Sequence, residues 1–294
     1  MTAPHRRFLR ERLGNAREPL RVPGIYDGLS ALLAEQAGFD AAFLSGACLS
    51  FARFGRPDVG LVTASEVATT VAILRDRVGL PLIVDIDTGF GNALNVQRTV
   101  RDLERAGASA LQMEDQVAPK RCGHMTGKAV ISRQEMVGKI KAALDARQDD
   151  ATMIIARTDA LAVNGFDDAL DRAEHYLLAG ADALFIEAPQ THEQMTIIGK
   201  RFGARAPLVH NLVEGGNSPV ADADALAELN YRIALYPAAL LNITTPVAEM
   251  VLRVIADTGC TDSLRGQMYD LFDLNRLLGA EQLLATGARF GGEE

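Results

Sequence analysis

Five short hydrophobic segments of this chain share one layout: each runs without interruption and then ends abruptly in polar or charged side chains. The segments lie at 81–87, 110–115, 153–159, 183–187 and 207–211. Continuous apolar runs that alternate with amphipathic stretches of helix length predict parallel strands buried on both faces. In a closed parallel barrel, the carboxyl ends of the strands form the active-site face. The layout therefore predicts an enzyme whose carboxylates, arginine and amide gather at one end of a barrel.

The same rhythm continues through most of the chain and predicts an α/β fold, a (β/α)8 TIM barrel. A helix end, a glycine and a new hydrophobic strand recur at Gly38, Gly107 and Gly180, and Asn230 replaces the glycine in a fourth copy. Glycine and asparagine tolerate the left-handed backbone that ends a helix. The predicted strands are 20–26, 41–45, 82–87, 110–114, 153–158, 183–187, 208–211 and 233–236. The predicted helices between them include 65–78, 93–106, 133–146, 167–179 and 192–202.

The length of 294 residues suits a single barrel domain, 1–294, whose barrel occupies about 20–257. Two segments near the end, 247–257 and 262–285, have helical apolar spacing, and the extension at about 258–294 is surplus to the barrel. The apolar stripes of these segments need burial, which a neighbouring subunit could supply as readily as the chain's own barrel.

The composition excludes several classes of protein. The net charge of -8 disfavours nucleic acid as a partner, although local basic clusters can still bind anions. No hydrophobic run approaches the roughly 20 residues that span a bilayer, and the arginine-rich segment 1–21 lacks the apolar core of a secretory signal. Cys48, Cys122 and Cys260 are too few for a disulfide framework. We therefore expect a cytoplasmic protein with free thiols that binds no membrane.

The loop after the fourth predicted strand is the most specific stretch of the sequence. It is longer than most strand-to-helix loops, and long loops at a catalytic face often act as lids. Cys122 lies in it beside Lys120, Arg121 and His124, whose positive charge would stabilise a thiolate. This setting indicates a catalytic acid or nucleophile. The alternative is that Cys122 is an inert small residue.

Three motifs resemble the isocitrate lyase and phosphoenolpyruvate mutase superfamily: KRCGH at 120–124, DIDTGFGN at 85–92 and ARTDA at 156–160. The resemblance covers nearly the whole chain, from 23 to 237. It implies a Mg²⁺-dependent (β/α)8 barrel that acts on 2-oxo or 2-hydroxy acids, with Mn²⁺ as a substitute ion. It also implies a homotetramer whose last barrel helix is exchanged between paired subunits. Within the loop, it implies catalytic roles for Cys122 and His124 and a substrate contact at Gly123.

Acidic residues at the ends of the third and fourth strands predict the metal site. Asp85 and Asp87 lie two residues apart, so their side chains share a face, and Glu114 ends the next strand. A few carboxylates suit Mg²⁺ better than zinc, for which a histidine or thiolate cluster is expected. Asp58 matches a further family acid near the metal, although alone it is typical of a turn. The alternative is that these acids cap helices or pair with Arg157.

The carboxylate of a substrate needs a planar fork of donors or a row of amides. Arg157 supplies the fork, and the family uses the positions that match Ser45, Gly46 and Ala47 for backbone N–H groups. Those three residues would otherwise form a simple turn. Glu187 and Asn211 match positions that contact the substrate or its associated network, although each could be structural. Arg157 and Glu187 are also predicted catalytic residues, and Asp85 is a predicted substrate contact as well as a metal ligand.

These parts predict a carbon–carbon lyase. The metal polarises the C2 oxygen of the substrate, so cleavage of the C2–C3 bond leaves a 2-oxo acid and a carboxylate-stabilised carbanion. Cys122 would protonate that carbanion once the loop excludes water. Some lyases of the family have a tyrosine where this chain has Phe43, so the base for the 2-hydroxyl stays open among Glu187, a metal-linked carboxylate and water.

The segment 211–219 bears on the substrate, because it resembles the Asn-x-x-Glu-Gly-Gly pattern of the 2-alkylmalate lyase and carboxyphosphonoenolpyruvate mutase branch. It adds Glu214 to the predicted substrate contacts. Isocitrate and methylisocitrate lyases have a hydroxyl where this chain has Val213, and methylisocitrate lyases have a basic residue where it has Met125. An anion without its donor is strongly disfavoured. We therefore favour a 2-hydroxy dicarboxylate, such as a 2-alkylmalate, over methylisocitrate.

Three alternatives remain. A carboxyphosphonoenolpyruvate or phosphonopyruvate type of mutase would isomerise a C–P bond with the same metal. An oxaloacetate decarboxylase or hydrolase would act on a 2-oxo acid. A binding or structural protein on the same barrel is the third alternative, because a fold does not determine function.

Overall fold

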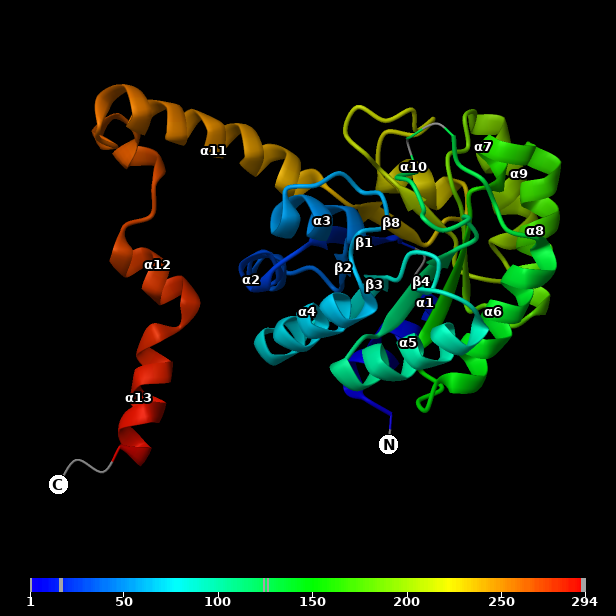
Figure 1. Ribbon diagram of the computed structural model, residues 1–294, viewed down its shortest axis with the longest axis horizontal. Coiled ribbons are helices and arrows are strands. Elements are labelled where there is room, and N and C mark those ends of the chain that lie inside the picture. The colour runs from blue at the N-terminus through cyan, green and yellow to red at the C-terminus, as the bar shows by residue number, and fades with distance from the viewer. Residues whose placement is uncertain (1, 16–17, 124, 126, 292–294) are drawn as a thin grey trace. The chain divides into compact units, whose positions relative to one another are not determined.

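The computed structural model describes residues 2–15, 18–123, 125 and 127–291. Its strands are β1 (Leu20–Ile25), β2 (Ala42–Leu44), β3 (Leu82–Asp85), β4 (Ala110–Glu114), β5 (Met153–Thr158), β6 (Ala183–Ile186), β7 (Val209–Asn211) and β8 (Ile233–Tyr236). They form one parallel sheet in the order β6-β5-β4-β3-β2-β1-β8-β7. A parallel bridge between Leu184 and Leu208 joins the two end strands. The barrel is thus nearly closed and surrounded by helices (Figure 1), which confirms the predicted TIM barrel.

The helices of the barrel lie between the strands, close to the predicted positions. They are α2 (Gly28–Gln36), α3 (Gly46–Phe54), α4 (Ala64–Arg77), α5 (Ala93–Ala106), α6 (Arg133–Ala146), α7 (Ala160–Asn164), α8 (Phe166–Leu178), α9 (His192–Phe202) and α10 (Ala223–Glu228). Capping boxes at Thr63 and Asn92 start α4 and α5, because each side chain accepts a hydrogen bond from an otherwise unpaired backbone N–H. The five predicted helices are confirmed as α4, α5, α6, α8 and α9.

Left-handed backbone ends several of these helices, as the sequence predicted. The angle φ is +81° at Gly38, +107° at Gly107, +102° at Gly180 and +62° at Asn230. At Gly107 a methyl group would also lie 2.6 Å from the side chain of Arg75. Glycine is therefore required there both by the backbone angle and by the close neighbour.

Residues two apart on a strand point to the same side, so alternate residues fill the barrel and the others face the helices. The interior set forms one hydrophobic cluster, which includes Leu20, Val22, Phe43, Ile83, Ile155, Phe185, Val209 and Ile233. The intervening residues, such as Val84 and Leu111, belong to a larger cluster with the helices. This alternation fixes which residues at the strand ends point to the mouth of the barrel.

Helix α1 (Pro4–Asn15) precedes the barrel and was not predicted. Leu9 and Leu13 on this helix belong to the hydrophobic cluster of the barrel interior. Arg6 donates hydrogen bonds to the carbonyls of Glu104 and Ala108 and pairs with Asp149 at 3.1 Å. The arginine-rich start of the chain is therefore partly buried structure, held against the turns that precede β4 and β5.

The chain divides into two compact units, Met1–Leu241 and Asn242–Glu294. The second contains most of α11 (Ala239–Thr258), a 3₁₀ helix η1 (Asp262–Gln267), α12 (Leu271–Leu278) and α13 (Ala280–Phe290). The stretch 262–285, predicted as helical, is broken, because Gly279 has φ of +78° between α12 and α13. Leu264 is the only buried side chain in the described part of this unit. The assignment of 1–294 to one domain stays a prediction.

Helix α11 differs from the expectation about membranes. Among the described residues it is the one helix long and apolar enough, by length and composition, to cross a bilayer. Its apolar residues form no uninterrupted run, because Asn242, Thr244 and Thr245 and the charged Glu249 and Arg253 lie among them. A helix whose apolar side packs against protein has the same length and composition, so this feature alone does not assign a membrane location.

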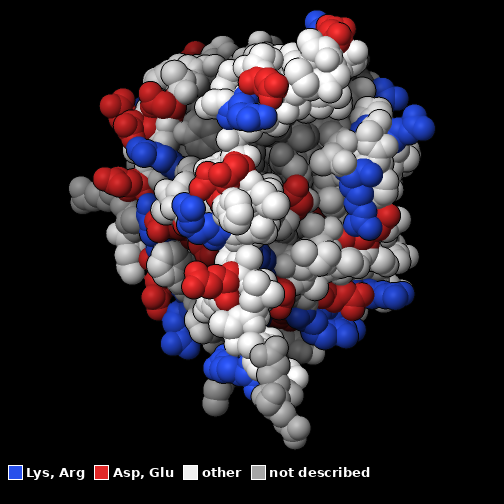
Figure 2. Space-filling view, turned by 90° about the vertical axis from the view of Figure 1, so that its left-hand side faces the viewer, with Lys and Arg blue, Asp and Glu red and all other residues white. Residues whose placement is uncertain are grey.

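Charges of both signs are interspersed on the face shown in Figure 2, where basic and acidic groups alternate over short distances. On the described part of that face, Lys and Arg form no continuous basic surface. On this face, the mixture of signs agrees with the acidic balance of the sequence.

Candidate active site

Five polar side chains lie at the ends of successive strands, on the same side of each strand as the residues that fill the barrel. They are Asp85, Glu114, Arg157, Glu187 and Asn211, which lie at the ends of β3 to β7. The Arg157 guanidinium lies 3.3 Å from Glu114 and 4.0 Å from Glu187. Asn211 donates a hydrogen bond of 3.3 Å to Glu187. The structure thus brings these residues together at one end of the barrel, on the face where such barrels hold their active sites.

A lysine from the long loop lies among the predicted metal acids. The Lys120 ammonium is 2.6 Å from Asp58 and 2.9 Å from Asp87, and all three side chains are buried. Burial, together with the charge of Asp85, raises the pKa of Asp87 to about 6 against the opposing effect of Lys120. The surrounding carboxylates also raise the pKa of Lys120 well above its ordinary value, although burial opposes this. The cluster holds more negative than positive charge.

The donor set fits a divalent cation. Glu114 is buried, its Oε1 has no hydrogen-bond partner, and Asp87 Oδ1 has none of good geometry although Lys120 lies nearby. Burial raises the pKa of Glu114 well above its usual value, even though Arg157 opposes this. In the described part of the chain, no three His, Cys, Asp or Glu side chains converge as they stand on a metal-sized position. Partly unpaired, buried carboxylates with hard oxygen atoms are nevertheless the ligands that Mg²⁺ prefers.

Arg157, on β5, is held in a fixed orientation by Asp159, which directly follows that strand. Its Nε and Nη2 donate to the carboxylate of Asp159 at 2.9 and 3.1 Å, and its guanidinium lies 5.1 Å from the ring centre of Phe185. Asp159 in turn accepts at 2.8 Å from the Lys128 ammonium, and its backbone N–H donates to Asp115 at 3.0 Å. The fork is therefore pre-oriented toward the barrel mouth, where it can bind a carboxylate.

Ser45, Gly46 and Ala47 form the start of α3 rather than a simple turn. Ser45 caps the helix by accepting a hydrogen bond of 3.2 Å from the N–H of Cys48. A methyl group at Gly46 would lie 3.0 Å from Asp85 and 3.4 Å from Asp87. The backbone of this segment therefore lies directly beside the acidic cluster, and a larger residue at this position would press on the Asp85 carboxylate.

The loop with Cys122 folds back over the strand ends. The Cys122 N–H donates to the carbonyl of Asp58 at 3.2 Å, and the thiol is partly buried. The Gln116 side chain donates to the carbonyl of Arg121 and accepts from the N–H of Arg121, at 2.9 Å each. A methyl group at Gly123 would lie 2.6 Å from Glu187, so this loop residue is in close contact with the site. His124 lies outside the described residues.

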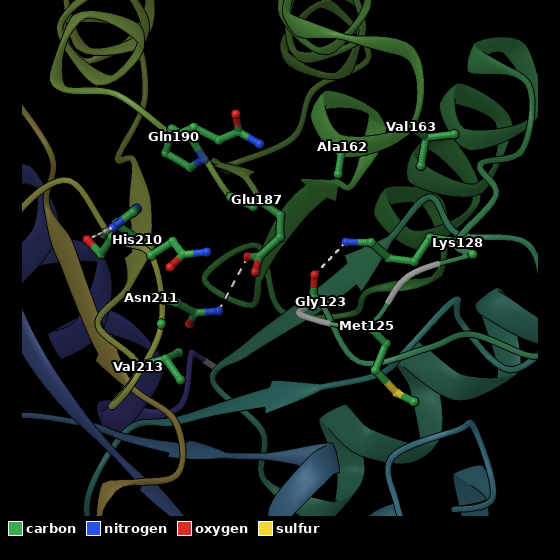
Figure 3. A pocket seen from close by; sticks show the side chains of 16 residues that line it. Gly123, Met125, Lys128, Ala162, Val163, Glu187, Gln190, His210, Asn211 and Val213 are labelled. Carbon is green, nitrogen blue, oxygen red and sulfur yellow. Dashed lines mark hydrogen bonds between the residues drawn. The ribbon is translucent and has the colours of Figure 1, made fainter.

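A cavity of about 340 Å³ opens between this loop and the ends of β6 and β7. Figure 3 shows Glu187, His210 and Asn211 on one side and Gly123, Met125 and Lys128 on the other. Ala162, Val163, Pro189 and Val213 give it apolar walls, with Gln190, Asn217 and Ser218 as neutral polar groups. Glu214 is exposed and is not one of the described lining residues. The cavity can enclose a small acid whose far end is uncharged.

Sequence reasoning missed several residues of this site. Lys120 was noted only as part of a basic cluster, yet it pairs with the acids. Asp159, Lys128 and His210 were not singled out. His210 is buried and faces Ser218 at 2.8 Å, and burial lowers its pKa to about 4. The ARTDA motif already contained Asp159, and its spacing of two residues from Arg157 on a strand was the available signal.

Comparison with known proteins shows similarity to named lyases and to one enzyme family. The family described as phosphoenolpyruvate phosphomutase matches residues 9–255. A 2-methylisocitrate lyase of Aeropyrum pernix is 44% identical over 90% of this chain and 84% of its own length. A 2,3-dimethylmalate lyase of Eubacterium barkeri is 41% identical over 89% and 90% of the two chains.

Solved structures agree with these sequence relationships. An oxaloacetate acetylhydrolase in complex with 3,3-difluorooxalacetate superposes with a TM-score of 0.92 at 31% identity, covering 98% of each chain. A phosphonopyruvate hydrolase complex with oxalate and Mg²⁺ superposes with a TM-score of 0.87 at 31% identity, covering 99% of each chain. With its barrel, its acidic strand ends and these matches, the chain belongs to the phosphoenolpyruvate mutase/isocitrate lyase superfamily.

Proposed function

We propose that this protein is a Mg²⁺-dependent carbon–carbon lyase that cleaves a 2-hydroxy dicarboxylate to a 2-oxo acid and a carboxylate. The observation that carries the proposal is the grouping of buried acids and an oriented arginine at the strand ends. Beside them lie the loop of Cys122 and a cavity lined by Gly123, Glu187 and Asn211. Relatives named 2-methylisocitrate lyase and 2,3-dimethylmalate lyase support the reaction class. The solved relative that contains oxalate and Mg²⁺ supports the metal.

Asp85, Asp87, Glu114 and Asp58 are the residues that would hold the ion, with Mn²⁺ as a substitute. When bound, the ion polarises the C2 oxygen of the substrate. Asp87 and Glu114 suit this role because each has a buried oxygen without a well-formed hydrogen bond. Asp85 also lies next to Gly46, where substrate and acid cluster would meet.

Arg157 and the amides of Ser45, Gly46 and Ala47 would bind the carboxylate next to C2. The guanidinium offers a planar pair of donors, and Asp159 fixes its orientation. Gly123, Asn211 and Glu187 would complete the contacts around the reacting carbons, and Glu214 stays a predicted contact from the sequence pattern alone. These contacts would hold the substrate in a geometry from which the bond can break.

Cys122 is the proposed general acid. The 2-hydroxyl loses its proton, the C2–C3 bond breaks with its electron pair on C3, and the C2–O bond becomes a carbonyl. The Cys122 S–H then gives its proton to C3. His124, two residues along the loop, would assist this transfer. Glu187, a carboxylate of the acid cluster or water takes the hydroxyl proton, because Phe43 provides no phenol there.

The walls of the cavity support a dicarboxylate over a tricarboxylate. Val213 offers no hydroxyl, Met125 offers no cation, and the Lys128 ammonium already pairs with Asp159. A third carboxylate in this space would lose its hydration without gaining a charged partner. A 2-alkylmalate, with an alkyl group at the same place, meets apolar side chains instead.

The assembly is proposed to be a homotetramer in which the last barrel helix is exchanged between paired subunits. The apolar side chains of α11 to α13 support this, because residues such as Ile243, Leu252, Phe272 and Leu284 are exposed in the single chain. A cytoplasmic location without nucleic-acid or membrane partners completes the proposal, and the whole of 1–294 would act as one enzyme subunit.

The experiment is turnover with a panel of substrates in Mg²⁺: 2-alkylmalates, methylisocitrate, oxaloacetate and phosphonopyruvate. A 2-oxo acid released from a 2-alkylmalate supports the proposal. Phosphonopyruvate as the best substrate would indicate the mutase alternative, and release of oxalate or CO₂ from oxaloacetate alone would indicate the hydrolase or decarboxylase.

A further inference from the structure

Lys128 lies in the long loop, five residues after Gly123, and its side chain is only 4% exposed. Its ammonium donates to the carbonyl of Gly123 at 2.6 Å and to Asp159 at 2.8 Å. Figure 3 shows the bond to Gly123 as a dashed line across the cavity wall. One buried cation thus connects the backbone next to Cys122 with the carboxylate that orients Arg157.

Asp159 is a fixed anchor for this connection. It is fully buried, and its backbone N–H donates to Asp115 at 3.0 Å. Asp115 is itself held by the hydroxyls of Thr158 and Tyr176, at 2.7 Å each. Burial opposes ionisation of Asp159, but Arg157 and Lys128 together lower its pKa to about 2. Asp159 is therefore a fixed carboxylate that pairs with two cations, Arg157 and Lys128.

Gly123 is the point where the loop meets the strand ends. A methyl group there would lie 2.6 Å from Glu187 Oε1 and 2.8 Å from Arg157 Nη2, so the backbone leaves no space for a side chain. Other contacts hold the loop before Gly123: Gln116 binds Arg121, and the Cys122 N–H binds Asp58. The bond from Lys128 is on the opposite side of Cys122. The cysteine is therefore held between two attachments.

We infer that Lys128 is a positioning residue that ties the Gly123 carbonyl to Asp159 and so fixes the Cys122 thiol, next to Gly123 in the cavity wall. It acts through the loop backbone and does not contact the reacting carbons. The inference rests on the proposed function only for its effect on turnover. Its effect on the reactivity of the Cys122 thiol follows from the geometry alone.

The test is the rate at which iodoacetamide alkylates Cys122 in the full-length protein, read by peptide mass spectrometry so that Cys48 and Cys260 are scored separately. In Lys128→Met the loop loses its attachment, and we expect alkylation of Cys122 to speed up by about tenfold, as for a segment that opens locally more often. Asp159 keeps Arg157 as its counter-ion in that variant. Lys141→Met, at an exposed position of α6, is the matched control and is expected to change nothing.

Turnover provides the second readout. With the preferred substrate, Lys128→Met is expected to lower kcat by about tenfold or more while KM changes less than threefold, because only the placement of the proton donor changes. Lys128→Gln can still donate to the Gly123 carbonyl, so its kcat and its alkylation rate are expected to lie between those of Lys128→Met and the original protein. It replaces Lys128→Met in the test if that variant does not fold. Unchanged alkylation in both variants overturns the inference. If Cys122→Ser retains turnover but the alkylation rates change as expected, the general-acid role proposed for Cys122 is wrong and the inference stands.

Discussion

The ammonium group of Lys120 lies 2.6 Å from Oδ1 of Asp58, with both side chains almost completely buried. The loop that carries Cys122 therefore brings its own cation into the acid cluster proposed to hold Mg²⁺. Removing one partner of a buried ion pair costs roughly 3 to 5 kcal/mol. The placement of the loop and the charge state of the acids proposed to bind the metal are thus parts of one network.

Removal of the metal should stop the reaction. We expect EDTA to abolish turnover, Mg²⁺ to restore it fully and Mn²⁺ to restore it in part. Asp87→Ala should stay inactive at any Mg²⁺ concentration, because it removes a buried oxygen that has no well-formed hydrogen bond of its own. Asp76→Ala, on the exposed side of α4, is the control for loss of one carboxylate. Full activity in EDTA would remove the metal from the proposal.

The thiol of Cys122 should matter for rate rather than for stability. We expect Cys122→Ser to lose about 100-fold or more in kcat, the scale of general acid catalysis, with little change in the free energy of unfolding because the side chain is only partly buried. Cys260→Ser, at an exposed site, is the matched control. A near-normal kcat in Cys122→Ser would assign the thiol a structural role or indicate decarboxylase chemistry.

The barrel was predictable from sequence because two local signals agree. The buried strands are continuous apolar runs, and the helix ends carry residues such as Gly107 that tolerate a left-handed backbone. Helix α1 was missed because Phe8, Leu9 and Leu13 are its only large apolar side chains and arginines dominate the rest of the segment. Arg6 is buried only because it meets the carbonyls of Glu104 and Ala108, a tertiary relationship that no local pattern contains.

The strand-end residues of the site were also predictable, because side chains two apart on a strand point to the same side, and this decides which of them face the barrel mouth. The residues that support the site were not predictable. Lys120, Lys128 and Asp159 acquire their roles from the way a long loop folds back over the strand ends, and loop geometry depends on contacts distant in sequence. Asp115 lies next to the predicted ligand Glu114 but faces Tyr176 instead.

His210 should make the protein less stable in acid. Burial lowers its pKa to about 4 in the folded chain, below the ordinary value of 6.5. As pH falls below 6.5, the unfolded chain binds a proton that the folded chain does not, so the free energy of unfolding falls until about pH 4. The difference corresponds to about 3 kcal/mol. His5, whose pKa burial also lowers to about 4, contributes in the same direction.

The measurement is urea unfolding at a series of pH values between 7 and 4. We expect His210→Asn to give a shallower loss of stability over this interval than the original protein, whatever its stability at pH 7. His192→Asn, at an exposed site on α9, is the control and should keep the original slope. An unchanged slope in His210→Asn would show that other groups account for the acid sensitivity.

Substrate choice depends on the neutral wall of the cavity. Val213 and Met125 both line the cavity, and Lys128, which also lines it, is already paired with Asp159. A third carboxylate would therefore lose hydration without a partner, whereas an alkyl group would bury apolar surface. We expect kcat/KM for a 2-alkylmalate or oxaloacetate to exceed that for methylisocitrate by at least about 100-fold, or roughly 2.7 kcal/mol.

Val213→Ser, which replaces apolar methyl groups with a hydroxyl, should narrow that ratio, and Val163→Ser, on the opposite wall, is the matched control. If methylisocitrate proves the better substrate, Asn217 and Ser218 become the residues to substitute, because they are the neutral donors left in the same wall.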